Sequence, residues 1–226
     1  MALSTEDHKR VSAAIGKAEA LTAGEIFCVF TEAADDHAVV PLGYAALMAL
    51  VLPPVLIWFG LLDPAWLTAI WAGGWSSGEA PGVRETVTLY VASSAILFAL
   101  TWLFVRIEAV RYRLAPASLR QIAVHRAAME SFLSHGIHLT DGRTGVLIFL
   151  SRRDRHAEIV ADEGIYEKVD EDVWADATAA MLACARQGDI GSGFVVAVEH
   201  AGEVLAAHFP PAPHNPNELP DRLIEV

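Results

Sequence analysis

Two long uncharged stretches dominate the hydropathy pattern of this chain. Residues 39–62 and 86–105 contain no Asp, Glu, Lys or Arg, and most of their side chains are apolar. At a helical rise of about 1.5 Å per residue, each stretch is long enough to cross a hydrocarbon core of roughly 30 Å. They therefore predict a transmembrane hairpin. Two fully buried helices of a soluble bundle are the alternative, but a small soluble domain has no need of two such spans.

A second pattern, from Arg143 to Gly164, predicts a β-hairpin. Val146 to Leu150 is an unbroken apolar run, as in a central strand that is covered on both faces. Four polar residues, Arg152 to Arg155, interrupt this run. Ala157 to Val160 then resumes an extended pattern among polar neighbours, which is typical of an edge strand.

Helices and one further strand flank this β-hairpin along the chain. Glu25 to Thr31 is rich in Ile, Phe and Val and predicts a buried strand. Apolar residues at three- and four-residue spacing predict four helices. They run from Ser4 to Gly24, from Pro116 to Gly136, from a cap at Asp170 or Asp172 to Gly188, and from Ile190 to His208. Within the last of these, Phe194 to Val198 has strand propensity, but the helical spacing continues through it and favours a helix. The fold class is therefore α/β: a small three-layer α/β/α sandwich interrupted by a two-helix transmembrane hairpin.

The changes of pattern divide the chain into four segments. Residues 1–37 form the first part of the sandwich domain, and residues 107–210 form its second part. Residues 38–106 form the inserted hairpin. Residues 211–226 are rich in Pro, Asn and charged side chains, so they predict a disordered tail.

Basic residues and tryptophans indicate how the hairpin is oriented. The linker of residues 63–85 has one basic residue, Arg84, whereas four follow the second span closely: Arg106, Arg111, Arg113 and Arg120. By the positive-inside rule the linker lies outside and both soluble parts lie in the cytoplasm. The linker also holds Trp66, Trp71 and Trp75, and a short helix over residues 65–71 would suit the headgroup region. These features predict a multi-pass protein of a bacterial-type inner membrane.

Composition narrows the classes of partner. The chain has 54% hydrophobic residues, a mean hydropathy of +0.37 and a formal net charge of −12. Because 16 basic residues face 28 acidic ones, nucleic acid is not expected as a partner. Cys28 and Cys184 lie in apolar segments and form neither a metal-ligand pair nor a disulfide framework. The polar start of the chain is unlike a cleavable secretory signal.

Several short motifs, in their order along the chain, resemble those of the TPM domain family. The first is Ala18-Glu19, Thr22 and Gly24-Glu25-Ile26. It is followed by TGVLIF from Thr144, by Asp154-Arg155, by AD-x-GI from Ala161, by Trp174 and by GD-x-x-x-G from Gly188. The family is named for thylakoid-lumen, photosystem-repair and nematode receptor-accessory proteins. The resemblance covers residues 4–34 and about 110–210, which excludes the hairpin and the tail.

Acidic residues are expected to meet at one end of the predicted sheet. Glu25 begins the first strand, Asp141 precedes the second, and Asp162 and Glu163 end the antiparallel third. Converging carboxylates suit a hard cation such as Ca²⁺ or Mg²⁺, although acidic residues at strand ends are also common as turn formers and helix caps. The resemblance implies divalent-cation binding, and a plant member of the family is described as an acid phosphatase. In many relatives an Asp-Asn-Gly precedes the second strand, where this chain has Arg143-Thr144-Gly145.

The opposite end of the sheet brings Asp35 and Asp36 next to the turn from Ser151 to Arg155. This group can be interpreted as a second acidic site, as a contact for anionic lipid headgroups, or as a solvated turn, which we favour.

No catalytic motif accompanies these acids: the sequence has no HExxH, P-loop, G-x-S-x-G or dinucleotide fingerprint. We therefore expect a membrane-anchored, non-catalytic module that binds a partner protein, under control of a divalent cation, in assembly or maintenance of a membrane complex. The small residues in the spans, such as Gly43 and Ala49, also permit a homo-oligomer. The alternative is a metal-dependent phosphatase in which Asp141, Asp162 and Glu163 hold the cation and Arg143 binds phosphate.

Overall fold

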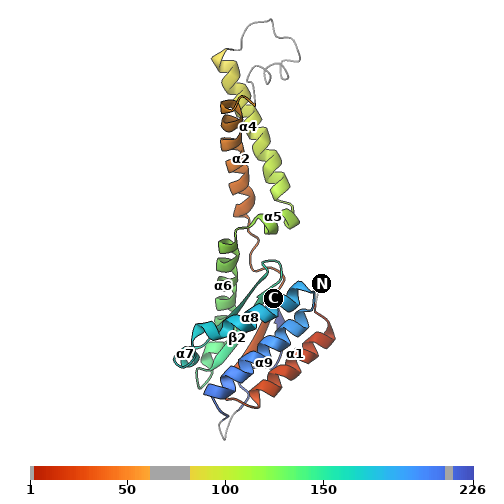
Figure 1. Cartoon of the computed structure of the whole chain (residues 1–226), viewed down its shortest axis with the longest axis vertical. Helices are drawn as coiled ribbons and strands as arrows, with labels where there is room; N and C mark the ends of the chain where they lie inside the picture. The colour runs from red at the N-terminus through yellow and green to blue at the C-terminus, as the bar shows by residue number, and fades with distance from the viewer. Residues whose placement is uncertain (1–2, 62–81, 212–215) are drawn as a thin grey trace. The chain divides into compact units, whose positions relative to one another are not determined.

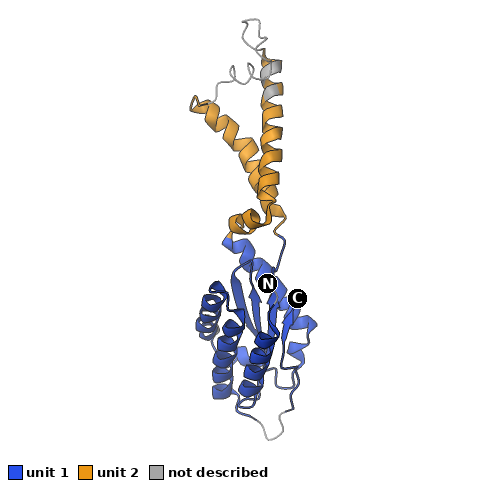
Figure 2. Cartoon of the chain, turned by 90° about the vertical axis from the view of Figure 1, so that its right-hand side faces the viewer, with its two compact units in different colours: residues 1–36, 117–226 blue, residues 37–116 orange. Residues whose placement is uncertain are grey.

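The chain folds into two compact units. The computed structural model describes residues 3–61, 82–211 and 216–226. Unit 1 comprises residues 1–36 and 117–226, and unit 2 comprises residues 37–116 (Figure 2). Unit 2 is therefore an insertion in unit 1, and it extends ten residues beyond the predicted end of the hairpin at residue 106. The short helix predicted over residues 65–71, with its tryptophans, lies outside the described residues.

Unit 1 is built on a four-stranded mixed sheet with the strand order β3-β2-β1-β4. The strands are β1 (Glu25–Thr31), β2 (Gly145–Ser151), β3 (His156–Ala161) and β4 (Leu223–Glu225). β1 is parallel to both β2 and β4, whereas β3 pairs with β2 in the antiparallel sense. Every residue of β1 and β2 is buried, which explains why neither strand shows the alternation of a half-exposed strand.

Helices cover both faces of this sheet. On one face α1 (Thr5–Glu19), α8 (Trp174–Arg186) and α9 (Ile190–His208) lie side by side, and α6 (Ala117–Ser134) covers the other (Figure 1). Alternate residues of β1 supply the two cores: Ile26 and Cys28 face α1 and α9, whereas Phe27 and Val29 face α6. Shorter elements are η1 (Ile137–Leu139), α7 (Glu163–Tyr166) and η2 (Glu171–Val173). The predicted three-layer α/β/α arrangement is confirmed.

Local capping explains where the helices begin. Ser4 and Asp7 form a capping box at α1: the Asp7 amide donates to Ser4 Oγ (3.1 Å), and the Ser4 amide donates to Asp7 Oδ2 (3.2 Å). Asp189 caps α9 by accepting from the Ser192 amide (2.9 Å). The prediction that Asp170 or Asp172 caps α8 is wrong. The η2 turn intervenes, and Val173 at the cap position makes no side-chain hydrogen bond.

The prediction of a disordered tail is also wrong for residues 216–226. Leu223 pairs with Cys28 in the sheet, and the Val226 amide donates to the Phe30 carbonyl oxygen (3.0 Å). Leu219 and Leu223 are buried in the two cores. The strand has only three residues and follows a polar, proline-rich stretch, so its local sequence gives almost no periodic signal. Its formation depends on the edge that β1 offers.

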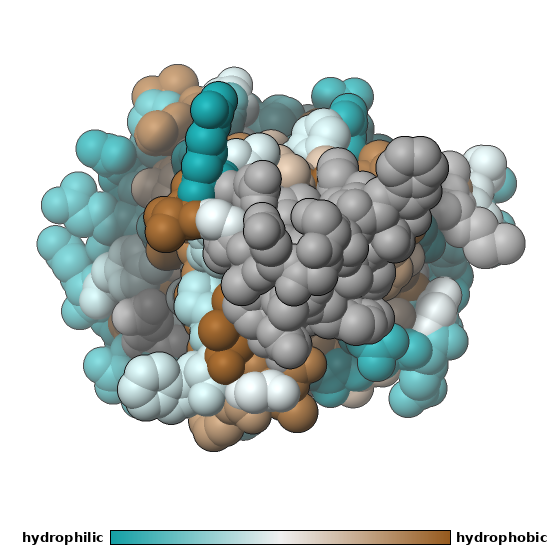
Figure 3. All heavy atoms as spheres, turned by 90° about the horizontal axis from the view of Figure 1, so that it is seen from above, coloured by the Kyte–Doolittle hydropathy of each residue, from teal (hydrophilic) through white to brown (hydrophobic). Residues whose placement is uncertain are grey.

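The described part of unit 2 contains α2 (Val39–Trp58), α4 (Val83–Val105) and α5 (Glu108–Leu114). α2 and α4 pack against each other along the hairpin. Pro53 and Pro54 lie inside α2, which ends four residues before the predicted Leu62, next to Gly60 with its positive φ of 67°. Large apolar side chains are exposed along both helices. Figure 3 shows hydrophobic residues, in brown, among hydrophilic ones at the surface of the molecule.

Among the described helices, α2 and α9 are each long and apolar enough to cross a membrane. A third span results if residues Tyr90–Val105 and α5, which are bent by 94° at their break, are taken together. The apolar residues of α9 instead pack inside unit 1, where six of them, including Phe194 and Leu205, belong to the hydrophobic core. The hydropathy of α9 is therefore that of a core helix.

Candidate functional site

The strand register brings the predicted acidic residues to one end of the sheet. Glu25 at the start of β1 pairs with Gly145 at the start of β2, and Val146 pairs with Ala161 at the end of β3. The Asp162 amide donates to the Gly145 carbonyl oxygen (2.9 Å). Glu25 and Asp162 therefore flank the first residue of β2 on its two sides.

Glu25 faces the chain's last segment. Its side chain is buried, and its Oε2 accepts from the Leu219 amide (3.1 Å). Burial raises the pKa of the Glu25 carboxyl group, and the nearby Glu218 and Asp221 carboxylates raise it further. The acid is thus engaged by residues that lie almost two hundred positions away in sequence.

Asp162 is buried at the beginning of α7 and uses one of its two oxygens. Oδ1 accepts from the Glu163 amide (2.7 Å) and lies 3.7 Å from Arg143 Nη1. Oδ2 is buried and has no hydrogen-bond partner in the described part of the chain. A buried acceptor without a partner costs free energy, so this oxygen is the strongest local indication of a ligand.

Asp141 and Glu163 complete the predicted set but contact different groups. Both are exposed, and the Asp141 amide donates to Glu218 Oε2 (2.9 Å). Across residues 3–61, 82–211 and 216–226, no three His, Cys, Asp or Glu side chains are grouped so as to hold a metal ion. The register assembles the predicted residues at one end of the sheet, but their carboxylates do not converge on a common point.

The sequence interpretation missed the most perturbed acid at this end, Glu19. Its Oε1 accepts from the Ile26 amide (2.8 Å), and its carboxyl group shares a hydrogen bond with Asp221. Burial raises the pKa of Glu19 to about 8, with further contributions from the negative charges of Glu25 and Asp221. The signal that marks it is the Ala18-Glu19 motif, which was quoted above only as a resemblance.

The same motif fixes the connection between α1 and β1. Thr22 Oγ1 donates to the Phe209 carbonyl oxygen (2.7 Å) and accepts from the Gly24 amide (3.1 Å). Glu19 and Thr22 therefore hold the start of β1 against the end of α9. Their role in this structure is to position the sheet.

Chemically, this end of the sheet can hold a proton. Burial raises the pKa of Glu19 to about 8, so its carboxyl group stays protonated near neutral pH.

At the opposite end, acidic and basic residues pair with one another. Asp35 lies 2.5 Å from Arg126, and Glu32 accepts from Arg153 Nε (2.9 Å) and from Arg152. Asp154 is buried, where its Oδ2 accepts from Ser151 Oγ (2.6 Å) and from the Ala34 amide (2.8 Å). These contacts close the turn between β2 and β3 onto the end of β1.

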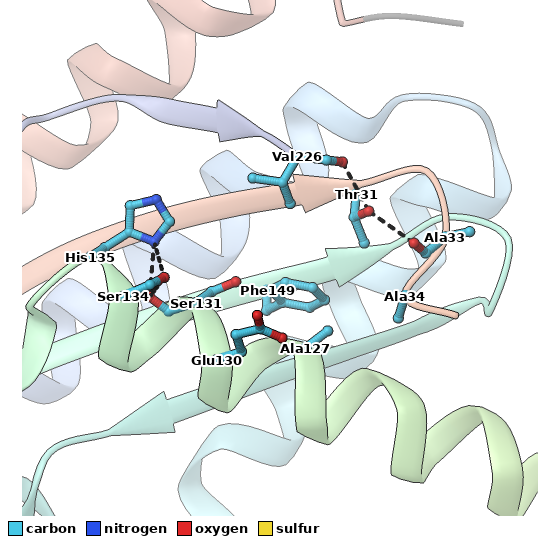
Figure 4. Close-up of a pocket in the computed structure, with 10 residues that line it drawn as sticks. All are labelled: Thr31, Ala33, Ala34, Ala127, Glu130, Ser131, Ser134, His135, Phe149 and Val226. Atoms are coloured by element: carbon cyan, nitrogen blue, oxygen red, sulfur yellow. Dashed lines mark hydrogen bonds between the residues drawn. The ribbon is translucent and has the colours of Figure 1, made fainter. Parts of the chain in front are cut away.

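A cavity of about 300 Å³ lies between this end of β1 and α6 (Figure 4). Glu130 and Ser131 of α6, and His135 directly after α6, line it opposite Thr31. His135 Nδ1 is 2.9 Å from the Ser131 carbonyl oxygen, so its ring is held against the last turn of α6. None of the four predicted metal ligands lines the cavity, so the cavity and the acidic end are separate features.

Comparisons with known proteins identify the domain. Residues 114–204 match the family described as the TPM domain. The fold is similar to the NMR structure of the BA42 protein from the psychrophilic bacterium Bizionia argentinensis, with a TM-score of 0.56 and 19% sequence identity over 100% of this chain and 97% of that chain. A comparison with curated proteins found no match. The predicted resemblance is confirmed for residues 114–204, which match the TPM domain.

Proposed function

We propose that this protein is a membrane-anchored TPM module that binds a partner protein in the assembly or maintenance of a membrane complex. The observation that carries the proposal is the apolar surface of unit 2, a helical hairpin inserted between β1 and α6 of the sandwich. An exposed apolar surface of this size is unfavourable in water and favourable in a bilayer.

The exposed residues support anchoring through both long helices. On α2, Leu47, Leu50 and Trp58 are 54%, 68% and 86% exposed, and on α4, Leu100 and Leu103 are 62% and 61% exposed. These side chains are not covered by the described part of unit 2. Two crossings also return the chain to the side from which it started, so both parts of unit 1 lie in one compartment.

The distribution of arginines supports a cytoplasmic position for the TPM domain. Three basic residues, Arg106, Arg111 and Arg113, closely follow the end of α4. At the other end of α4, Arg84 is the one basic residue before the uncharged stretch of residues 86–105. By the positive-inside rule, the end of α4 faces the cytoplasm.

Anchoring and orientation can be tested with single cysteines. We expect the full chain to stay in the membrane fraction after extraction with alkaline carbonate. In intact cells, an impermeant maleimide should label a Ser76→Cys variant, whereas an Arg155→Cys variant should be labelled only after permeabilisation. The native chain is the baseline, because Cys28 is buried and Cys184 half-buried. Release by carbonate would contradict anchoring, and the reverse labelling pattern would contradict the orientation.

Unit 2 itself indicates where a partner does not bind. Ala49, one of the small residues expected to permit a homo-oligomer, is buried between the helices of the hairpin together with Ala45, whereas Gly43 is exposed. Small residues let two helices approach closely, and here the intramolecular contact uses them. We therefore place the partner-binding surface on unit 1.

We further propose that a divalent cation binds at Asp162. The buried Oδ2 without a partner favours this, with the exposed Asp141 and Glu163 as side chains that can turn toward the ion. Arg143, 3.7 Å from Oδ1, opposes it. Glu25 is the least suitable of the four predicted ligands, because it already accepts from Leu219.

Thermal unfolding in detergent tests the cation proposal. With Ca²⁺ or Mg²⁺ at about 100 times its Kd, binding adds about 2.7 kcal/mol, so the Tm of the wild type should rise by several degrees. Asp162→Asn keeps the shape but loses the charge, and we expect no rise for it. Lys9→Gln, which changes an exposed charge elsewhere, should behave as wild type. Equal responses of wild type and Asp162→Asn would reject the site, and hydrolysis of a phosphate ester that is lost in Asp162→Asn would favour the phosphatase alternative.

A further inference from the structure

The chain turns sharply where the apolar helix α4 ends. α5 is bent by 94° relative to Tyr90–Val105, and the two helices are separated only by Arg106 and Ile107. If α4 crosses a bilayer, a helix at a right angle to it runs parallel to the membrane plane.

Contacts within unit 2 hold α5 next to the end of α4 and the first turn of α2. Val40 in the first turn of α2, Val105 at the end of α4 and Ala115 at the end of α5 form one buried cluster, with Leu114 packed against it. Tyr44 Oη donates to the Leu114 carbonyl oxygen (3.3 Å). α5 is therefore fixed at the end of the hairpin where both long helices meet the rest of the chain, which is where hydrocarbon gives way to headgroups.

The composition of this segment suits such a boundary. Residues 106–113 hold three arginines and one acidic residue, Glu108, in a chain whose net charge is −12. No residue of α5 is buried. Ile107, Val110 and Leu114 recur at three- and four-residue spacing, as on the apolar side of a helix that lies in an interface.

Two arginines at this bend, Arg106 and Arg113, differ from several arginines of unit 1. In unit 1, Arg126, Arg143 and Arg153 each lie within 4 Å of a carboxylate. Arg106 and Arg113 are exposed, and among the described residues no carboxylate pairs with either of them. Arg106 instead lies over the Trp102 ring, 5.1 Å from its centroid. Trp and Arg stacked at the end of an apolar helix are typical of a membrane interface.

We propose that α5 lies in the headgroup layer, where Arg106, Arg111 and Arg113 bind the phosphates of anionic phospholipids. A guanidinium group offers paired donors that match two phosphate oxygens, and the low local dielectric strengthens the contact. The proposal rests on the proposed membrane anchoring and adds to it a lipid preference. α5 would thereby select an anionic membrane surface.

Lipid titration of the full chain in an uncharged detergent, followed by native mass spectrometry, tests this. Wild type should bind phosphatidylglycerol about tenfold or more tightly than phosphatidylcholine. The double variant Arg111→Gln/Arg113→Gln should lose about tenfold in affinity for phosphatidylglycerol and little for phosphatidylcholine. The matched control Arg155→Gln/Arg186→Gln removes the same charge from exposed sites in unit 1 and should retain the preference.

Two further measurements keep the test decisive if the double variant does not fold. Glu108→Gln removes the one acid of the segment and should strengthen phosphatidylglycerol binding, and 0.5 M salt should weaken binding by the wild type. The proposal is overturned if wild type binds both lipids equally, if the control loses as much affinity as the α5 variant, or if neither Glu108→Gln nor salt has an effect. Carbonate extraction tests anchoring separately. If the chain stays in the membrane fraction but shows no preference for phosphatidylglycerol, only the role proposed for α5 is rejected, and the proposed anchoring stands.

Discussion

Replacing Glu19 with glutamine is expected to stabilise unit 1 near pH 8 by about 2 kcal/mol, after allowance for solvent screening of the side chain. The carboxyl group of Glu19 is buried beside Glu25 and Asp221, which raises its pKa from the ordinary 4.5 to about 8. Glutamine has no charge to lose. Its oxygen can still accept from the Ile26 amide, and its amide group can donate to Asp221.

The sign of this pH dependence follows because Glu19 takes up a proton when the chain folds between pH 4.5 and pH 8. In the unfolded chain Glu19 ionises near pH 4.5, whereas the folded protein keeps it protonated up to about pH 8. The stability that protonated Glu19 contributes is therefore complete below pH 4.5, falls as the pH rises from 4.5 to 8, and is lost above that window. The wild type and Glu19→Gln should consequently be similar in stability near pH 4.5 and differ most near pH 8.

Urea unfolding in detergent at pH 5 and pH 8, followed by far-UV circular dichroism, measures this difference. Glu203→Gln is the matched control, since it removes an exposed carboxylate of α9. The control should follow the wild type at both pH values. A Glu19→Gln variant whose pH dependence equals that of the wild type would show that Glu19 is ionised in the folded protein.

Leu223→Ala is expected to destabilise unit 1 by about 2–4 kcal/mol. Leu223 is 4% exposed, lies in the larger core and pairs with Cys28 in the sheet. Removing three carbons leaves a cavity at the edge of that core, and a three-residue strand has few other contacts that hold it in place.

The matched control for this change is Leu139→Ala, whose leucine is 72% exposed and should be replaceable within about 0.5 kcal/mol. Urea unfolding at one pH compares the two variants. Ending the chain after residue 215 should lower stability at least as much as Leu223→Ala, because it also removes Leu219 and the hydrogen bond to Glu25. A Leu223→Ala variant as stable as the wild type would show that β4 does not contribute to the core and would favour the predicted disordered tail.

The parts of the fold that sequence predicted well are those with a strong local pattern. β1 and α9 have the predicted bounds, Glu25–Thr31 and Ile190–His208, because an apolar run and a long helical spacing each specify one structure. The strand β4 could not be predicted in the same way. Three residues carry no measurable period, and only the exposed edge of β1 makes them a strand.

The candidate site was predictable only in outline. The register places Glu25 and Asp162 at one end of the sheet, as the predicted topology required. Their partners could not be inferred, since Leu219 comes from a tail expected to be disordered. Arg143 was noted as a departure from the family pattern, and it lies 3.7 Å from Asp162, where its charge competes with any cation.

The position of the hairpin within unit 1 has a consequence for how the protein is made. β1 leaves the ribosome first, but its parallel neighbour β2 begins about 120 residues later, after both helices of the hairpin. Contacts between such distant segments form slowly, and an unpaired apolar strand is prone to aggregate in the meantime. The sandwich can therefore close only after the hairpin has been synthesised, and until then β1 presents an unpaired edge to other chains.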